Sequence, residues 1–154
     1  MRRRRCGPGR ACRSDIPVPV NVGAEIAERA ITMVGIPFRL RGRTTESGVD
    51  CVGVVAEALA CTGIAFEIPC DYTLRGEYLG RVFAFFGRDC FRALARDHPQ
   101  PGDILLCRVA DRQLHFAVFT SRGIVHAHAG LRRVVLTPPP LPWHVIAHWR
   151  YIGD

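Results

Sequence analysis

The sequence lacks any apolar run long enough to cross a lipid bilayer. A membrane-spanning helix needs about 20 consecutive apolar residues, and the longest apolar stretches, such as residues 52–60, are far shorter. The hydrophobic region of a signal peptide is also missing, because Cys-Gly-Pro-Gly at residues 6–9 follows the opening charges. These absences predict that the protein does not insert into a membrane. They also predict that it is made in the cytoplasm without a secretion signal.

No acidic residue precedes Asp15, whereas residues 2–13 contain six arginines. The whole chain has a formal net charge of +7, so a charge of +1 remains without these six arginines. Arginines neutralise nucleic-acid phosphates, but this run lacks the interleaved aromatic residues or the folded motif that would position base contacts. We therefore predict no specific nucleic-acid partner, and we interpret residues 1–20 as a disordered tail or a misassigned start.

The seven cysteines include no Cys-x-x-Cys pair and no repeated spacing. Their odd number and irregular spacing argue against a secreted disulfide framework and against a structural zinc site. Four of these cysteines lie mostly among apolar neighbours, which is typical of small core residues: Cys61, Cys70, Cys90 and Cys107. The sequence thus predicts no metal and no cofactor.

Helical and strand patterns follow one another in blocks. Apolar residues at spacings of three and four predict helices at residues 23–34, 51–61 and 71–86. Short apolar runs separated by turn residues predict strands at residues 103–108, 115–120, 124–128, 131–136 and 145–152. Residues 39–49 are polar and contain glycines, which predicts a loop. Helices first and then an antiparallel meander predict one α+β domain over residues 21–154.

Cys51 opens the helix predicted at residues 51–61, and Asp50 can cap that helix through its carboxylate. A thiol in the first turn lies at the positive end of the helix dipole, which favours the thiolate form. Gly48 lets the preceding chain turn, and we expect Gly53 to leave open space one turn above the sulfur. The pattern favours a nucleophile, although a thiol beside valines is also typical of a buried core cysteine.

Three histidines lie on the predicted strands. His115 opens its strand after a polar loop, and a rigidly held imidazole suits a general base; the alternative is a half-exposed polar residue at a strand edge. His126 and His128 alternate by two, so they share one face of the next strand. We expect His115 at the thiol, His126 as its orienting partner and His128 as a neighbour. A His-x-His pair also occurs in metal sites, but this segment offers no third ligand.

Five segments of the chain resemble the NlpC-type peptidases, papain-like cysteine endopeptidases that cut bacterial cell-wall peptides. They occur in the order of that family and span roughly residues 24–152: GIPFR at 35–39, GVDCVGVV at 48–55, PGDILL at 101–106, HFAV at 115–118 and IVHA at 124–127. The resemblance implies a papain-like fold, in which N-terminal helices pack on a C-terminal antiparallel sheet meander.

The resemblance also implies roles for individual residues. Cys51 matches the nucleophile, His115 the general base and His126 the third polar residue. Asp50 matches an acid that lies beside the substrate's amino end in relatives, and we assign Phe38 and His128 with it to substrate binding. The implied reaction is hydrolysis of the bond between γ-linked D-glutamate and a diamino acid in peptidoglycan stem peptides, through an acyl-enzyme.

Two positions depart from the family pattern. Phe38 stands where relatives often have a tyrosine whose hydroxyl helps to hold the oxyanion or the substrate, and Val52 stands where they often have serine. Loss of such a donor costs other enzymes several kcal/mol of transition-state stabilisation. The alternative hypothesis is therefore a catalytically weak or inactive assembly component that retains the fold, and a smaller one is an amidase or acyltransferase variant.

The length and organisation of the chain suggest where the protein acts. A short chain without a signal, with a helical insert between Cys51 and Gly102, resembles the peptidases carried on phage tails and gene transfer agents. This resemblance implies phage-tail or baseplate partners, and action in the periplasm or cell wall after delivery by the particle.

Overall fold

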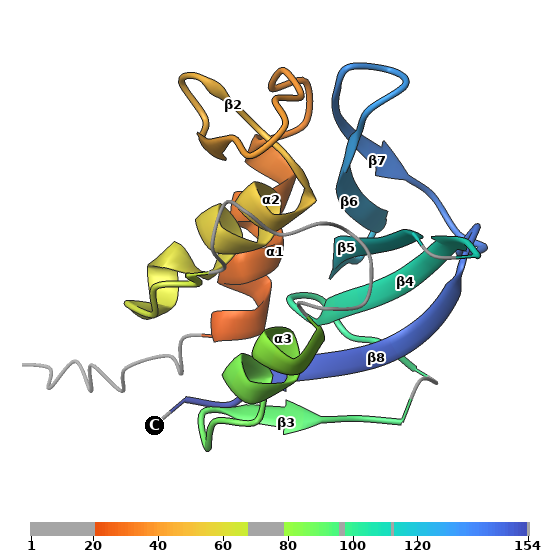
Figure 1. The fold of residues 1–154 in the computed structure, drawn as a ribbon. Helices are drawn as coiled ribbons and strands as arrows, with labels where there is room; N and C mark the ends of the chain where they lie inside the picture. Colours follow the sequence, from red (N-terminus) through yellow and green to blue (C-terminus); the bar gives the residue numbers. More distant parts are fainter. Residues whose placement is uncertain (1–20, 68–78, 96–97, 112, 154) are drawn as a thin grey trace, which may run out of the picture.

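The computed structural model describes residues 21–67, 79–95, 98–111 and 113–153 (Figure 1). The predicted tail at residues 1–20 lies outside the described residues, and so do residues 71–78 of the third predicted helix and Cys70. No described helix is both long and apolar enough to cross a membrane. The described cysteines are all unpaired; Cys90 and Cys107 are buried as predicted, whereas Cys61 is partly exposed.

Two helices form the N-terminal layer. Helix α1 (Val22–Thr32) begins after Asn21, whose side chain accepts a hydrogen bond from the Ala24 amide at 3.1 Å and so caps the helix. Helix α2 (Cys51–Leu59) continues into a short 3₁₀ turn, η1 (Ala60–Thr62), which ends at Gly63. Gly63 has a φ of +77°, the left-handed conformation that glycine adopts at little cost. Helix α3 (Leu79–Phe86) is the described part of the third predicted helix.

Six antiparallel strands form the second layer, in the spatial order β3-β8-β4-β5-β6-β7. Their bounds are β3 (Phe91–Ala93), β4 (Ile104–Ala110), β5 (Gln113–Thr120), β6 (Gly123–His128), β7 (Arg133–Thr137) and β8 (His144–Tyr151). Strands β4 to β7 form the predicted meander. Strand β8 crosses back to pair with β4, and β3, which the sequence did not predict, pairs with β8.

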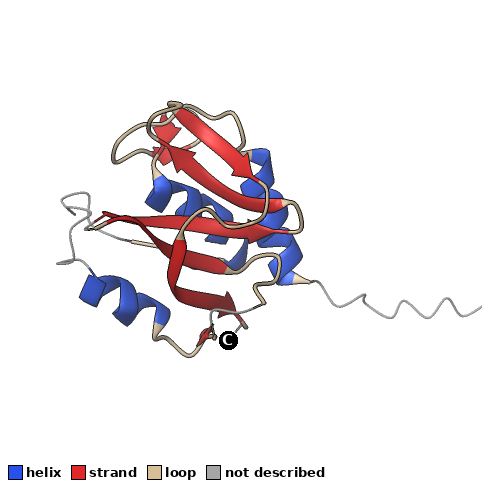
Figure 2. Ribbon diagram, turned by 90° about the vertical axis from the view of Figure 1, so that its right-hand side faces the viewer, coloured by secondary structure: helices blue, strands red, loops and turns tan. Residues whose placement is uncertain are grey.

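Helices α1 and α2 cover one face of this sheet; Figure 2 shows the strands in front of them. The core between the layers includes Ile26 of α1, Val52 and Leu59 of α2, and Phe116 of β5, all fully buried. On the β3–β8 side, the Phe86 ring of α3 stacks on Trp149 with centroids 4.2 Å apart. The packing of α2 on β5 brings the start of the helix to the start of that strand.

The loop predicted at residues 39–49 contains a two-stranded hairpin, β1 (Arg43–Thr44) with β2 (Gly48–Val49). This loop packs tightly on α2: a Cβ added at Gly53 would lie only 2.3 Å from the Gly42 carbonyl oxygen. The expectation that Gly53 leaves open space above the thiol is therefore wrong. The glycine instead allows the hairpin backbone to approach the helix closely.

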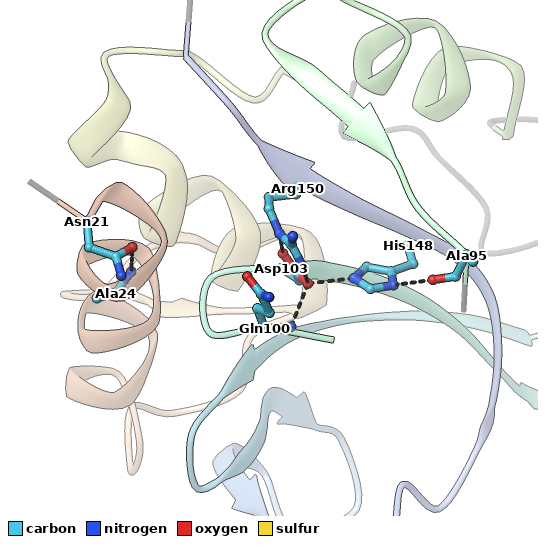
Figure 3. A network of polar contacts seen from close by, with 7 residues as sticks. All are labelled: Asn21, Ala24, Ala95, Gln100, Asp103, His148 and Arg150. Atoms are coloured by element: carbon cyan, nitrogen blue, oxygen red, sulfur yellow. Dashed lines mark hydrogen bonds and ion pairs between the residues drawn. The ribbon is translucent and has the colours of Figure 1, made fainter. Parts of the chain in front are cut away.

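A buried charged cluster ties β4 to β8 (Figure 3). The Asp103 carboxylate accepts two hydrogen bonds from Arg150, at 2.7 and 2.8 Å, and one from His148 at 2.6 Å. It also accepts one from the Gln100 amide, while the other His148 ring nitrogen pairs with the Ala95 carbonyl at 3.0 Å. Asp103 and His148 have no exposed side-chain area, so this second acid–histidine pair is a structural feature of the interior.

Candidate active site

Cys51 is the first residue of α2 and is 4% exposed. Its sulfur interacts with two backbone amides, those of Phe116 and Val52. Phe116 follows His115 directly on β5. The thiol of the helix therefore lies against the strand segment that carries the predicted base.

A chain of three side chains crosses strands β5, β6 and β7. His115 Nε2 lies 3.1 Å from His126 Nδ1, and His126 Nε2 lies 2.8 Å from the hydroxyl oxygen of Thr137. Both nitrogens of His126 are thus engaged, and the ring is 1% exposed. The structure brings His115 and His126 together as the sequence predicts, and it adds Thr137 at the end of the chain.

A pocket of about 260 Å³ opens over these groups. All six residues assigned from the sequence line it: Phe38, Asp50, Cys51, His115, His126 and His128. Its remaining wall is largely apolar, with Leu40, Val109 and Trp143 among the contributors. The predicted nucleophile, base and third polar residue therefore line one cavity.

Burial sets the protonation of the site. Burial raises the pKa of Cys51 to about 12; the nearby Asp50 charge adds to this, while the Phe116 amide and Arg43 oppose it. Burial lowers the pKa of His115 to about 4, with His128 contributing. Burial likewise lowers the pKa of His126 to about 3. The resting groups are thus a neutral thiol beside neutral imidazoles, and the thiolate expected from the helix dipole is outweighed by desolvation.

Asp50 makes its contacts within the protein. Its carboxylate accepts hydrogen bonds from the Gly53 amide at 2.9 Å, the Arg41 amide at 2.8 Å and the Arg43 guanidinium at 2.8 Å. The side chain caps α2 and fastens the hairpin loop to it, and Asp50 is only 2% exposed. Asp50 lines the pocket as predicted, but its carboxylate forms hydrogen bonds with the start of α2 and with the loop before it.

Two residues of the site escaped the sequence analysis. The Trp143 indole packs edge-on against His115 and His126, with centroids 5.2 and 4.7 Å away. The only signal in the sequence is an aromatic residue within a proline-rich connection. Thr137 is a polar residue at the end of an apolar strand, which is equally common where no function exists. His128 accepts a hydrogen bond from the Leu131 amide at 3.1 Å and so shapes the turn beside the pocket.

Among the described residues, no group of three or more His, Cys, Asp or Glu side chains is placed to hold a metal ion. Both ring nitrogens of His126 already have partners within the protein. The arrangement is suited to nucleophilic catalysis by a cysteine with an adjacent base.

A scan of the sequence against protein-family models found no match, and a search of curated proteins found none. Solved structures are similar in fold. NlpC1 from Trichomonas vaginalis has a TM-score of 0.64 at 19% sequence identity, over 90% of this chain and 47% of its own. The NlpC/p60 domain of the peptidoglycan hydrolase SagA has a TM-score of 0.54 at 22% identity, over 75% of this chain and 88% of that domain. This protein has the NlpC/p60 fold.

The predicted α+β, NlpC-type fold is therefore confirmed. The chain spans about half the length of the Trichomonas protein that it resembles. RipD from Mycobacterium tuberculosis is also similar, with a TM-score of 0.54 at 14% identity, over 85% of this chain and 97% of that one. RipD is described as a non-catalytic NlpC/p60 domain protein adapted to peptidoglycan binding, so the NlpC/p60 fold occurs with and without catalysis.

Proposed function

We propose that the protein is a cysteine peptidase that hydrolyses peptidoglycan stem peptides, at the bond between γ-linked D-glutamate and the diamino acid. The observation that carries the proposal is the shared pocket, which is lined both by Cys51 at a helix start and by a histidine pair bonded at 3.1 Å. The fold is that of peptidoglycan hydrolases such as SagA, which supports the substrate class.

The chemistry follows from a neutral resting pair. His115 takes the Cys51 proton as the sulfur attacks the scissile carbonyl carbon, so both charges appear together and attract each other within the pocket. The positive charge on His115 is stabilised by His126, which lies 3.1 Å away. His115 then protonates the leaving amine, and the acyl-enzyme is hydrolysed by a water that His115 deprotonates. The Cys51 backbone N–H, at a helix start, is the candidate oxyanion donor.

Delivery by a phage tail or gene transfer agent is part of this proposal. It rests on the resemblance noted in the sequence, and it assigns the partner as a tail or baseplate protein. The protein would then act on the wall in the periplasm or at the cell surface, carried there by the particle.

The alternative is a protein that binds wall or tail components without cleaving. Two observations favour it: Phe38 lines the pocket where a hydroxyl donor is often found in the family it resembles, and burial holds Cys51 in its neutral form. RipD is a non-catalytic protein of the same fold. An amidase or acyltransferase activity would use the same dyad and differ only in the group that accepts the acyl chain.

Digestion of purified disaccharide-tetrapeptide, with the products identified by mass spectrometry, distinguishes these functions. The wild type is expected to release a fragment cut between D-glutamate and the diamino acid, and Cys51→Ala is expected to release none. Cys61→Ala is the matched control, because Cys61 is a partly exposed thiol on η1, away from the pocket. Absence of cleavage by folded wild type, on lysine-type and diaminopimelate-type peptides alike, would contradict the peptidase function and favour the binding role.

A further inference from the structure

Two loops form the rim of the pocket, and they lie side by side. The first covers residues 36–41 after α1, and the second covers residues 129–133 between β6 and β7. The Phe38 amide donates to the Arg132 carbonyl at 2.9 Å, and the Val134 amide donates to the Ile36 carbonyl at 2.8 Å. Both loops lie at the top of the molecule in Figure 1, and both contribute residues to the pocket wall.

Four arginines project from these loops, and we call them the arginine rim: Arg39, Arg41, Arg132 and Arg133. All four are exposed. Within the described part of the chain, the salt bridges of Asp50 and Asp103 involve other arginines. Residues 36–50 contain two acids, of which Asp50 is buried and paired with Arg43, and residues 126–137 contain none. The two loops beside the pocket therefore carry a concentration of positive charge, although residues 14–154 carry a net charge of only +1.

The strand register places one of these arginines on the catalytic face. Arg133 pairs with His128 across β6 and β7, and Thr137, four residues along β7, bonds His126. Residues directly opposite on neighbouring strands share a face of the sheet, and positions that differ by two or four along a strand do so as well. Arg133 thus lies on the same face as the histidines that line the pocket.

The backbone of the rim is also unusual. Arg41 and Arg132 have φ angles of +61° and +58°, in the left-handed region that costs a residue with a side chain about 1 kcal/mol or more. Glycine would adopt this conformation at little cost. Arginine at both positions keeps two charges on the loops beside the pocket at the expense of backbone strain.

We propose that the arginine rim selects stem peptides whose carboxylates beside the scissile bond are ionised, and that it discriminates against amidated ones. This inference rests on the proposed substrate class. The D-glutamate α-carboxylate adjoins the bond to be cut, and diaminopimelate carries a second carboxylate at the end of an aliphatic side chain. The apolar pocket wall accepts the aliphatic part, and guanidinium groups at the mouth match carboxylates through paired N–H donors.

The expected preference is modest because the rim is exposed to solvent. One exposed ion pair changes an equilibrium by about 1.4- to 5-fold, so two carboxylates should favour the ionised peptide by about 2- to 25-fold. Salt screens such pairs over roughly 10 Å at 0.1 M. The preference should therefore shrink as ionic strength rises, whereas contacts in the apolar wall should change little.

The test compares two disaccharide-tetrapeptides that differ only in amidation of the D-glutamate and diaminopimelate carboxylates. Cleavage is measured as kcat/KM with the wild type, and binding is measured by calorimetry with Cys51→Ala, at low and at high NaCl concentration. The double variant Arg39→Ala/Arg133→Ala removes two rim charges and leaves the strained positions Arg41 and Arg132 unchanged. Arg122→Ala, in the turn at the other end of β6, removes a charge remote from the pocket.

The expected result is a preference for the ionised peptide that falls at high salt, disappears in the double variant and persists in Arg122→Ala. Equal cleavage of both peptides by wild type would overturn the rim proposal and leave the peptidase proposal standing. Selective binding without cleavage would overturn the peptidase proposal and support the rim as a binding surface. Failure to bind or cleave either peptide would overturn both.

Discussion

Replacing Thr137 by valine tests how the histidine pair is oriented. Thr137 Oγ1 lies 2.8 Å from His126 Nε2, and His126 Nδ1 lies 3.1 Å from His115 Nε2. When the hydroxyl oxygen accepts a hydrogen bond from the His126 Nε2–H, His126 Nδ1 has no proton and must accept a hydrogen bond from the His115 Nε2–H. His115 Nδ1 then keeps its lone pair and can take the proton of Cys51. In the opposite tautomer His115 carries its proton on Nδ1 and cannot act as the base.

The size of the effect follows from burial. His126 is 1% exposed, so valine leaves a buried ring nitrogen without a partner, at a cost of about 1–3 kcal/mol. Without the hydroxyl the His126 ring is no longer held in the orientation that bonds His115, and each 1.4 kcal/mol lost by that oriented state corresponds to about a tenfold change in rate. Thr137→Val should therefore lower kcat/KM by about 5- to 150-fold, while Thr137→Ser, which keeps the hydroxyl, should recover most of it.

The assay is kcat/KM for disaccharide-tetrapeptide cleavage, measured together with the free energy of unfolding in urea. Thr120→Val is the matched control, since the Thr120 hydroxyl donates to the Gly123 carbonyl at 2.9 Å in the turn between β5 and β6, away from the pocket. It should lose comparable stability and keep its activity. An unchanged kcat/KM in Thr137→Val, or an equal loss in Thr120→Val, would refute the orienting role.

Three further predictions concern charge and burial. The cleavage rate should fall as the pH drops through about 4, because protonated His115 cannot accept the thiol proton. It should stay level through neutral pH, because burial raises the pKa of Cys51 to about 12. An acid limb near the ordinary histidine pKa in the pH–rate profile would contradict both expectations. Trp143→Ala should admit water to the pocket, relieve the burial that lowers the pKa of His115, and move the acid limb to higher pH; a limb that does not move would show that the indole is not what buries the ring. Asp103→Asn should lower the free energy of unfolding by about 3–5 kcal/mol in urea titrations, because it leaves buried partners uncompensated, whereas the exposed Asp89→Asn should change it by less than about 0.5 kcal/mol.

The Asp103 cluster also predicts how stability depends on pH. Burial alone would raise the pKa of Asp103, but hydrogen bonds from Arg150 and His148 outweigh it and lower the pKa. A carboxyl with a lowered pKa in the folded state stabilises the protein fully above its unfolded pKa, about 3.9. That contribution is lost as the pH falls below this value and through the folded pKa. Asp103→Asn should therefore flatten the acid side of the wild-type stability curve, and an unchanged slope would contradict the assignment.

Local patterns in the sequence were sufficient for most elements of the fold. The positions of α1, α2 and the four strands of the meander follow from apolar periodicity, which reflects one buried face in each element. The helix start at Cys51 was predictable because capping by Asp50 involves residues three apart. Strand β3 was missed because three residues carry too little periodicity, and its pairing with β8 joins segments about 60 residues apart.

Long-range packing decided the parts of the site that the sequence did not predict. Trp143 and Thr137 contact the histidines only because β7 and the connection to β8 return to the pocket. No pattern in the sequence near these two residues predicts that contact. The charge state was mispredicted for the same reason: the helix dipole is a local property of the chain, whereas desolvation depends on everything that surrounds the sulfur.

The sequence by itself predicted which residues form the candidate site: a cysteine at a helix start, and histidines on the strands that follow. The tertiary structure alone decided that they line one pocket, that burial shifts the pKa values of the thiol and the imidazoles toward their neutral forms, and that four exposed arginines lie on the two loops beside the pocket. The physical reason is that capping and periodicity depend on neighbours along the chain, whereas burial, strand order and the electrostatic field of the pocket arise from segments that meet only after folding.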